Sequence, residues 1–317
     1  MKLIRLLALS LSATVLATSA AAQDAVRSIR IINQFGPGGG ADAIVRPLLE
    51  RFGAEMGRAA VIEYKPGASG AIAAAELEKS PPDGTTLIID TQTLSTNSVL
   101  RKVNYRHAEW EPVALLGQIP LALVAGKQLP ADSLKDLVAH ARKNPEKVTY
   151  ATLGPGSAAH LAALRFERAM GIKLLPVAYR FTTEVHTDMI GGRIDLFFDG
   201  VTQALPRYQS GQLRLLGVGT EERIGQAQAI PTFKEQGFDL TVGAWFGIAA
   251  PKGTPADVVT KLADSFAKAV NAPDYQRRMA EAGVIVSSLG PQRFAAFRRE
   301  DQSRWASLIR EANLVLE

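Results

Sequence analysis

The segment Phe35-Gly36-Pro37-Gly38-Gly39-Gly40-Ala41-Asp42 joins a predicted strand at residues 28–35 to a predicted helix at residues 41–56. Glycine adopts backbone conformations that other residues avoid, so this run permits a sharp turn and a close approach of the backbone to another molecule. The first amide groups of a helix have no partner within it and attract anions. The segment therefore predicts a strand-turn-helix unit with an anion in front of the turn.

Short apolar runs rich in β-branched residues alternate with amphipathic helical patterns along the rest of the chain. This alternation predicts parallel sheets connected by helices, an α/β fold. Two longer apolar runs, residues 113–125 and 244–250, are each followed by a break rich in Pro and Gly and by a new helix, so we expect them to pass between two lobes. The expected division is lobe 1 at residues 23–122 and 222–317, and lobe 2 at residues 123–221, with a ligand cleft between them.

A second glycine turn, Ala151-Thr152-Leu153-Gly154-Pro155-Gly156-Ser157-Ala158-Ala159-His160, repeats the same chemistry in the middle of the chain. We expect Ser157 to cap the following helix and to direct its hydroxyl toward the cleft, with His160 on the same side of the first turn. A cap with a packed histidine and no ligand is the alternative. Ser157 and His160 also suggest a hydrolase dyad, but the G-x-S-x-G motif is absent.

Two aspartates have more than one interpretation. Asp42 would repel an anion bound at its own turn, so it is expected to cap the helix or to accept a hydrogen bond from an ammonium group of the ligand. Asp195 is expected to make structural bonds near the Gly191-Gly192 turn. Asp199, at the end of the predicted strand at residues 194–199, is placed to reach the cleft.

The N-terminus has the pattern of a signal peptide. Lys2 and Arg5 precede an apolar run at residues 6–16, and small residues end at Ala22, which predicts a cleaved signal at residues 1–22 and export to the periplasm. The apolar run is shorter than the roughly 20 residues of a membrane span. The chain has no cysteine, so neither disulfides nor a lipid-modified cysteine is expected.

Several other classes of function receive little support from composition and motifs. Removal of Lys2 and Arg5 lowers the formal net charge from +5 to +3, and no nucleic-acid partner is expected. The four histidines lack metal-binding spacings, so no metal is expected. Gly36, Gly38 and Ala41 match a dinucleotide-binding pattern with Glu63 as the ribose acid, but Pro37 and the export signal count against it. A purely structural turn remains an alternative.

The order and spacing of several motifs together resemble those of the tripartite tricarboxylate transporter substrate-binding family, the Bug-type periplasmic receptors. The motifs are residues 35–42, 65–70 (KPGASG), 82–87 (PDGTTL), 151–160, 191–199 (GGRIDLFFD) and 245–251 (WFGIAAP). The resemblance implies a two-lobed type II periplasmic-binding fold, a carboxylate or carboxylated amino acid as ligand, no cofactor and no enzymatic activity. It also implies a monomer that delivers its ligand to a membrane permease; a ligand sensor for a signalling system is the alternative.

The family's ligand-binding positions carry over to both glycine turns and to neighbouring strand ends. They imply the following ligand-binding residues: Phe35, Pro37, Gly38, Gly39, Gly40, Ala41, Asp42, Ser69, Thr91, Thr93, Thr152, Gly154, Gly156, Ser157, His160, Tyr179, Arg180 and Asp199. The chain departs from the family pattern at Ala41, Leu153, Pro155 and at Arg180-Phe181. These departures suggest a larger or more apolar ligand, with Arg180 as a candidate partner for a second carboxylate.

Overall fold

The computed structural model describes residues 28–100 and 102–311, and the predicted signal peptide at residues 1–22 lies outside them. Its strands are β1 (Ile29–Asn33), β2 (Ala60–Tyr64), β3 (Thr86–Thr91), β4 (Glu111–Ala125), β5 (Thr149–Thr152), β6 (Leu175–Ala178), β7 (Leu196–Gly200), β8 (Arg214–Val218), β9 (Gly243–Ala250) and β10 (Ile285–Leu289). Its helices are α2 (Gly40–Val45), α3 (Leu49–Met56), α4 (Ala71–Glu78), α5 (Gln92–Leu100), α6 (Leu134–Lys143), α7 (Ala158–Met170), α8 (Thr182–Ile190), α9 (Val201–Gln209), α10 (Ala256–Val270), α11 (Pro273–Glu281) and α12 (Pro291–Glu311).

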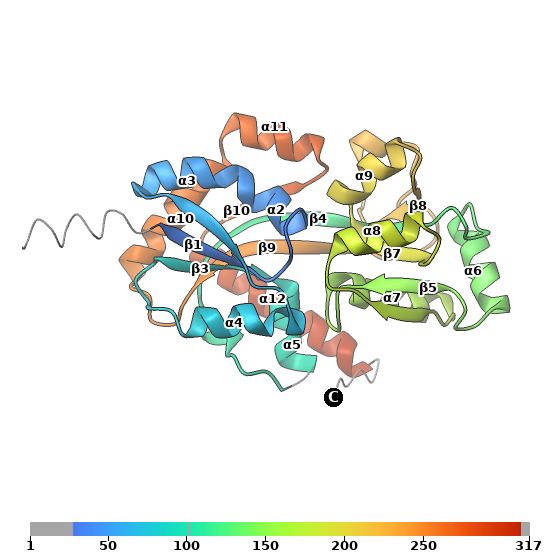
Figure 1. Cartoon of the computed structure of the whole chain (residues 1–317), viewed down its shortest axis with the longest axis horizontal. Coiled ribbons are helices and arrows are strands. Elements are labelled where there is room, and N and C mark those ends of the chain that lie inside the picture. The colour runs from blue at the N-terminus through green and yellow to red at the C-terminus, as the bar shows by residue number, and fades with distance from the viewer. Residues whose placement is uncertain (1–27, 101, 312–317) are drawn as a thin grey trace, which may run out of the picture.

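The strands form one continuous sheet that serves both lobes, in the order β2-β1-β3-β9-β4-β7-β5-β6, with β8 and β10 also paired to β4. The pairs among β1, β2 and β3 are parallel, and so are those among β5, β6 and β7. The antiparallel pairs among these strands all involve β4 or β9. Helices flank both halves, as Figure 1 shows, and the expected two-lobed α/β architecture is confirmed.

Strand β4 passes from one lobe to the other. Its first part, from Glu111 to Pro120, pairs with β9 in the first lobe. Its second part, from Leu121 to Ala125, pairs with β7 and β8 in the second lobe. Both faces of the strand are covered along most of its length, which explains why its sequence is a nearly unbroken apolar run. The first predicted passage between lobes is thus β4.

The chain returns to the first lobe beside β4. Leu121 N donates to the carbonyl oxygen of Val242 over 3.0 Å, and Val242 N donates to that of Gly219 over 3.1 Å. Before this point, Phe233 packs against Phe198 of β7, with ring centroids 6.0 Å apart. The predicted boundary at residue 222 stays a prediction.

Aromatic side chains hold helices in place in each lobe. In the first lobe, the rings of Phe52 (α3) and Phe266 (α10) stack with centroids 4.0 Å apart. In the second, Phe166 (α7) meets Phe198 (β7) edge to face at 5.9 Å. Burial of one such side chain stabilises the fold by about 1.5–3 kcal/mol. These contacts stabilise the packing of the helices within each lobe.

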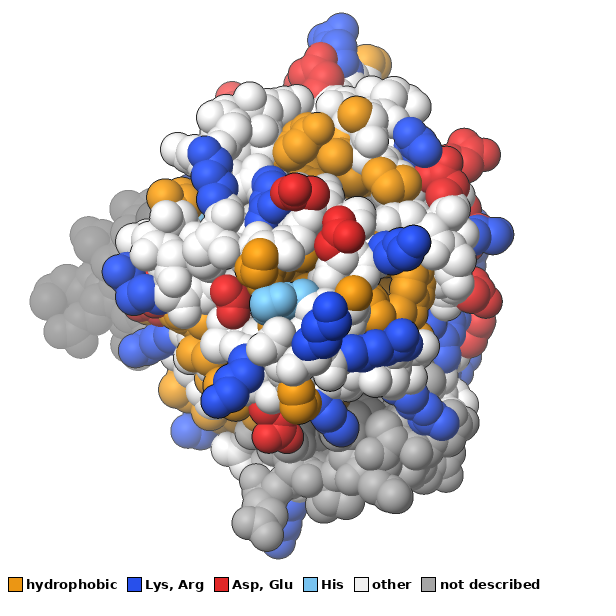
Figure 2. Space-filling view, turned by 90° about the vertical axis from the view of Figure 1, so that its right-hand side faces the viewer, with side chains coloured by type: hydrophobic (Ala, Val, Ile, Leu, Met, Phe, Trp, Pro, Cys, Tyr) orange, Lys and Arg blue, Asp and Glu red, His pale blue; other side chains and the backbone are white. Residues whose placement is uncertain are grey.

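The outer surface at the second-lobe end carries charges of both signs (Figure 2). Figure 2 shows basic and acidic side chains interspersed there with apolar ones. Among residues 28–100 and 102–311, none of the helices combines the length and the apolar character that a membrane crossing requires.

Candidate functional site

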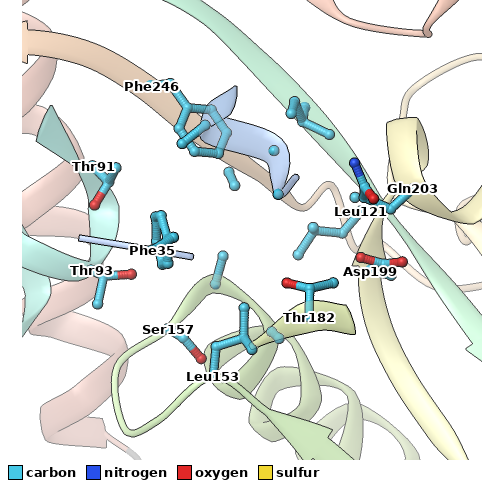
Figure 3. A pocket seen from close by; sticks show the side chains of 18 of the residues that line it. Phe35, Thr91, Thr93, Leu121, Leu153, Ser157, Thr182, Asp199, Gln203 and Phe246 are labelled. Atoms are coloured by element: carbon cyan, nitrogen blue, oxygen red, sulfur yellow. The ribbon is translucent and has the colours of Figure 1, made fainter. Parts of the chain in front are cut away.

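A cavity lies where the two lobes meet, and both lobes contribute to its wall (Figure 3). Its empty volume is about 880 Å³ when the open mouth is included. Residues of the first lobe and the β4 and β9 strands that line it include Phe35, Gly36, Pro37, Gly39, Gly40, Ala41, Thr91, Gln92, Thr93, Ile119, Leu121, Trp245 and Phe246. Those of the second lobe include Leu153, Ser157, Ala158, Ala159, Arg180, Phe181, Thr182, Phe198, Asp199, Gly200 and Gln203.

Several helices begin at this cavity. Helices α2, α5, α7, α8 and α9 all start with a cap or a first residue that lines it. In α7 the lining residues Ala158 and Ala159 occupy the first turn, where amide groups have no partner within the helix. Each helix start also carries a partial positive charge from the aligned peptide dipoles. The wall therefore presents N–H groups that have no partner within their helices, together with a positive field.

Ser157 caps helix α7, as predicted. Its Oγ accepts a hydrogen bond from His160 N over 3.3 Å and lies 3.2 Å from Thr152 Oγ1. The His160 side chain turns back instead: Nδ1 accepts from Gly156 N over 3.2 Å, and burial lowers the pKa of the imidazole. Both side chains bind backbone amides rather than each other, so the geometry of a hydrolase dyad is absent from this turn.

The Asp42 carboxylate is bound inside the first lobe. Its Oδ2 accepts from Gly38 N over 2.8 Å and from Tyr64 Oη over 2.8 Å, and it pairs with Arg46 Nη2 over 3.1 Å. Burial and the Asp42 charge raise the pKa of Tyr64 to about 12, so the phenol keeps its proton and donates. The carboxylate thus stabilises the glycine turn through its hydrogen bond with Gly38 N, and Asp42 does not line the cavity.

Asp199 faces the cavity beside Thr182 and Gln203 (Figure 3). Its Oδ2 lies 2.7 Å from His186 Nε2, and both side chains are only 3% exposed. Asp195 is structural, as expected, but its partner is different: it accepts from both N and Oγ1 of Thr149 on β5, over 2.8 Å each.

A shallower space adjoins the cavity at its mouth and shares Phe35, Thr93, Leu153 and Arg180 with it. Ser69, Gly154 and Tyr179 line this outer space. The Tyr179 phenol donates to Asp188 over 2.8 Å, and the Arg180 guanidinium lies 3.5 Å from the carbonyl oxygen of Pro66 and 5.3 Å from the Phe181 ring centre.

The predicted site residues thus fall into three groups. The cavity brings together Phe35, Pro37, Gly39, Gly40, Ala41, Thr91, Thr93, Ser157, Arg180 and Asp199. The outer space holds Ser69, Gly154 and Tyr179, and neither space is lined by Gly38, Asp42, Thr152, Gly156 or His160.

Sequence reasoning missed Thr182, Gln203 and Phe246, which also line the cavity, and it placed residues 91–93 in the wall without singling out Gln92. Gln92 is only 2% exposed, and its Nε2 has no hydrogen-bond partner in the part of the chain that the structure describes. A buried amide N–H without a partner is costly, and a ligand acceptor would satisfy it. The signal available in the sequence was a run of polar residues directly after a buried strand.

The comparisons with known proteins agree with this architecture. A family model described as tripartite tricarboxylate transporter family receptor matches residues 44–314. The chain is 31% identical, over 96% of its length and 93% of the relative's, to a UPF0065 protein of the tcbD-tcbE intergenic region of Pseudomonas sp. strain P51.

Among solved structures, the chain is similar to the periplasmic binding protein BugD, with 30% identity, a TM-score of 0.87 and coverage of 92% of this chain and 99% of that one. It is also similar to MatC of Rhodopseudomonas palustris with bound malate, with 28% identity, a TM-score of 0.85 and coverage of 90% and 99%. The fold is therefore that of periplasmic binding proteins. The chain belongs to the family of tripartite tricarboxylate transporter receptors.

Proposed function

We propose that the protein is a periplasmic receptor that holds a carboxylate-bearing small molecule between its lobes and delivers it to the permease of a tripartite tricarboxylate transporter. The observation that carries this proposal is the convergence of helix starts on the cavity, with the unpaired amide groups of α7 in its wall. MatC, similar along nearly its whole length, holds malate.

The binding free energy expected from these contacts is sufficient for a receptor. A hydrogen bond to a charged group contributes roughly 1.5–3 kcal/mol, and a helix start adds about 0.3–1 kcal/mol. Micromolar affinity requires about 8 kcal/mol in total. Two or three donors, from α7 and from Gln92 Nε2, together with apolar contacts, reach this range after the costs of ordering the ligand.

We propose that the predicted site residues that line the cavity contact the ligand, and that Gln92 contacts it as well. Arg180, at the mouth, is proposed to pair with a ligand carboxylate that extends that far. Unchanged affinity of an Arg180→Ala variant for every bound acid would exclude that contact.

The receptor role also includes three further proposals: cleavage of the signal peptide on export, action as a monomer, and binding without catalysis. They are supported by the signal-like N-terminus and by membership of a receptor family whose fold is that of periplasmic binding proteins. Mass spectrometry of the protein from a periplasmic extract tests the cleavage after Ala22.

Thermal-shift measurements test the ligand class. The mature chain is mixed with malate, adipate, benzoate or 4-hydroxybenzoate, and in parallel with the corresponding amides. A ligand at 100 times its dissociation constant stabilises the folded state by about 2.7 kcal/mol. We expect at least one acid, and none of the amides, to raise the melting temperature. Stabilisation by the amides alone would contradict the proposal.

A further inference from the structure

The cavity has two chemically different ends. Figure 3 shows Thr91, Thr93 and Ser157 on one side, and Asp199, Thr182 and Gln203 on the other. Helices α5 and α7 start on the first side, and α8 and α9 start on the second, beside Asp199, the one carboxylate among the described lining residues. We call the first side the amide end and the second the acidic end. A carboxylate of the ligand, as proposed above, fits the amide end.

The acidic end is formed around the Asp199 carboxylate. Asp199 Oδ2 is bonded to His186 Nε2, but His186 Nδ1 is buried and has no partner among the described residues. A proton on Nδ1 would be a buried cationic N–H without an acceptor, which is costlier than a bare nitrogen lone pair. The geometry therefore favours the tautomer in which Nε2 donates to the Asp199 carboxylate and Nδ1 is the nitrogen without a proton.

Asp199 retains one oxygen for the ligand. Within the described part of the chain, Oδ1 of this cavity-lining side chain has no hydrogen-bond partner. Arg180 is the one cation among the described lining residues, and its guanidinium lies at the shared mouth near Pro66 O. No basic side chain of the described lining therefore offsets a second ligand carboxylate at the acidic end, where it would meet Asp199.

Much of the cavity wall is apolar. Its apolar lining residues include Phe35, Ile119, Leu121, Leu153, Phe198 and Phe246. Such a surface gains free energy by covering an apolar ligand body, at roughly 25 cal/mol per Å² removed from water, and phenyl rings favour stacked or edge-on contact with another ring. The charged groups of a short dicarboxylate would gain little from it.

We infer that the ligand is an acid with a single carboxylate, an apolar body, and a hydroxyl or amino group at the far end that donates to Asp199 Oδ1. This inference rests on the proposed function and narrows its ligand class. Asp199 would then act as a specificity determinant: it accepts from a donor and repels a carboxylate at the same position.

Calorimetric titration of the mature full chain with 4-hydroxybenzoate, benzoate, terephthalate and adipate tests the inference. 4-Hydroxybenzoate and terephthalate share the ring and the first carboxylate. At the far end, 4-hydroxybenzoate carries a hydroxyl donor and terephthalate carries a second carboxylate. We expect 4-hydroxybenzoate to bind at least tenfold more tightly than terephthalate, with benzoate between them. Equal or tighter binding of terephthalate or of adipate would overturn the inference.

Two variants separate the role of Asp199 from a general loss of charge. Asp199→Asn keeps the size of the side chain and removes its charge, so the difference between 4-hydroxybenzoate and terephthalate should fall below threefold. Asp195→Asn, four residues earlier and bonded to Thr149, should leave the tenfold difference intact. Retained benzoate binding by Asp199→Asn shows that the variant is folded, and an unchanged preference in that variant would refute the inference.

Failure of this inference can be distinguished from failure of the proposed function. If adipate or malate binds and the benzoates do not, the carboxylate receptor stands and the inference is wrong. If no acid binds to the wild-type chain, both are wrong.

Discussion

Phe181 of the second lobe lies directly against the backbone of Gly36 in the first lobe. A Cβ built on Gly36 would lie 2.4 Å from Cδ1 and 2.8 Å from Cε1 of the Phe181 ring, far inside van der Waals contact. Both residues line the cavity. The two lobes approach so closely here that any side chain at position 36 would require the Phe181 ring or the backbone to shift.

The first prediction concerns this contact. Gly36→Ala should weaken binding of the strongest acid in the thermal-shift panel at least tenfold, because the methyl group prevents the lobes from meeting. Adding Phe181→Ala to Gly36→Ala should recover part of the loss, as calorimetry can measure. Gly225→Ala is a control, since no atom lies within 4 Å of its added methyl group. Equal affinities of Gly36→Ala and the wild type would show that the contact plays no part in binding.

The second prediction compares two helix caps. Ser157 Oγ caps α7 at the cavity, and Ser133 Oγ caps α6, which does not contribute to the cavity, by accepting from Asp136 N over 3.1 Å. Loss of either cap should destabilise the chain by about 1 kcal/mol in urea unfolding. Only Ser157→Ala should also reduce acid affinity. The same loss of affinity in Ser133→Ala would mean that reduced stability, rather than the local geometry of α7, causes the effect.

The third prediction concerns a buried ion pair behind the site. Arg298 Nε lies 3.2 Å from Asp90 Oδ2, and Asp90 Oδ1 lies 2.8 Å from His107 Nε2. Burial would raise the pKa of Asp90, but His107 and Arg298 together keep it below the ordinary value. Arg298→Met removes one partner and should destabilise the fold by about 3–5 kcal/mol in urea unfolding. Adding Asp90→Asn should restore part of this loss; a double variant less stable than Arg298→Met would contradict the charge argument.

The fourth prediction is a pH dependence of stability. Burial lowers the pKa of His160 in the folded chain, so the unfolded chain takes up the proton first as the pH falls below about 6.5. The free energy of unfolding should therefore decrease from pH 7 toward pH 5. His160→Gln should show a shallower decrease, since the contributions of the other groups are common to both chains. An equal decrease in the free energy of unfolding of the wild type and of His160→Gln would contradict the assignment to His160.

The sequence predicted the fold and the two glycine turns because both depend on local signals. Residues 35–42 and 151–160 each join a strand to a helix at the cavity, and the long apolar run within β4 passes between the lobes. Helix α12 shows the same local signal, since apolar residues of its amphipathic pattern are buried: Phe294 is fully buried, and Trp305 is 8% exposed.

Other parts depend on contacts that no local pattern contains. Helix α5 buries Gln92, Ser95, Thr96 and Asn97, polar residues that carry no amphipathic signal. The Asp42 carboxylate binds inside the first lobe instead of at the cavity because Tyr64, 22 residues later, donates a hydrogen bond to it. The pairing of Asp199 with His186 likewise depends on how α8 packs beside β7.

The central claim is that the cavity binds a carboxylate. The most direct test is calorimetric titration of the mature chain with the acid that gives the largest thermal shift and with its primary amide, which has nearly the same shape and no charge. We predict that the acid binds with at least tenfold higher affinity, and that Ser157→Ala narrows the difference. An amide that binds as tightly as the acid would contradict the claim.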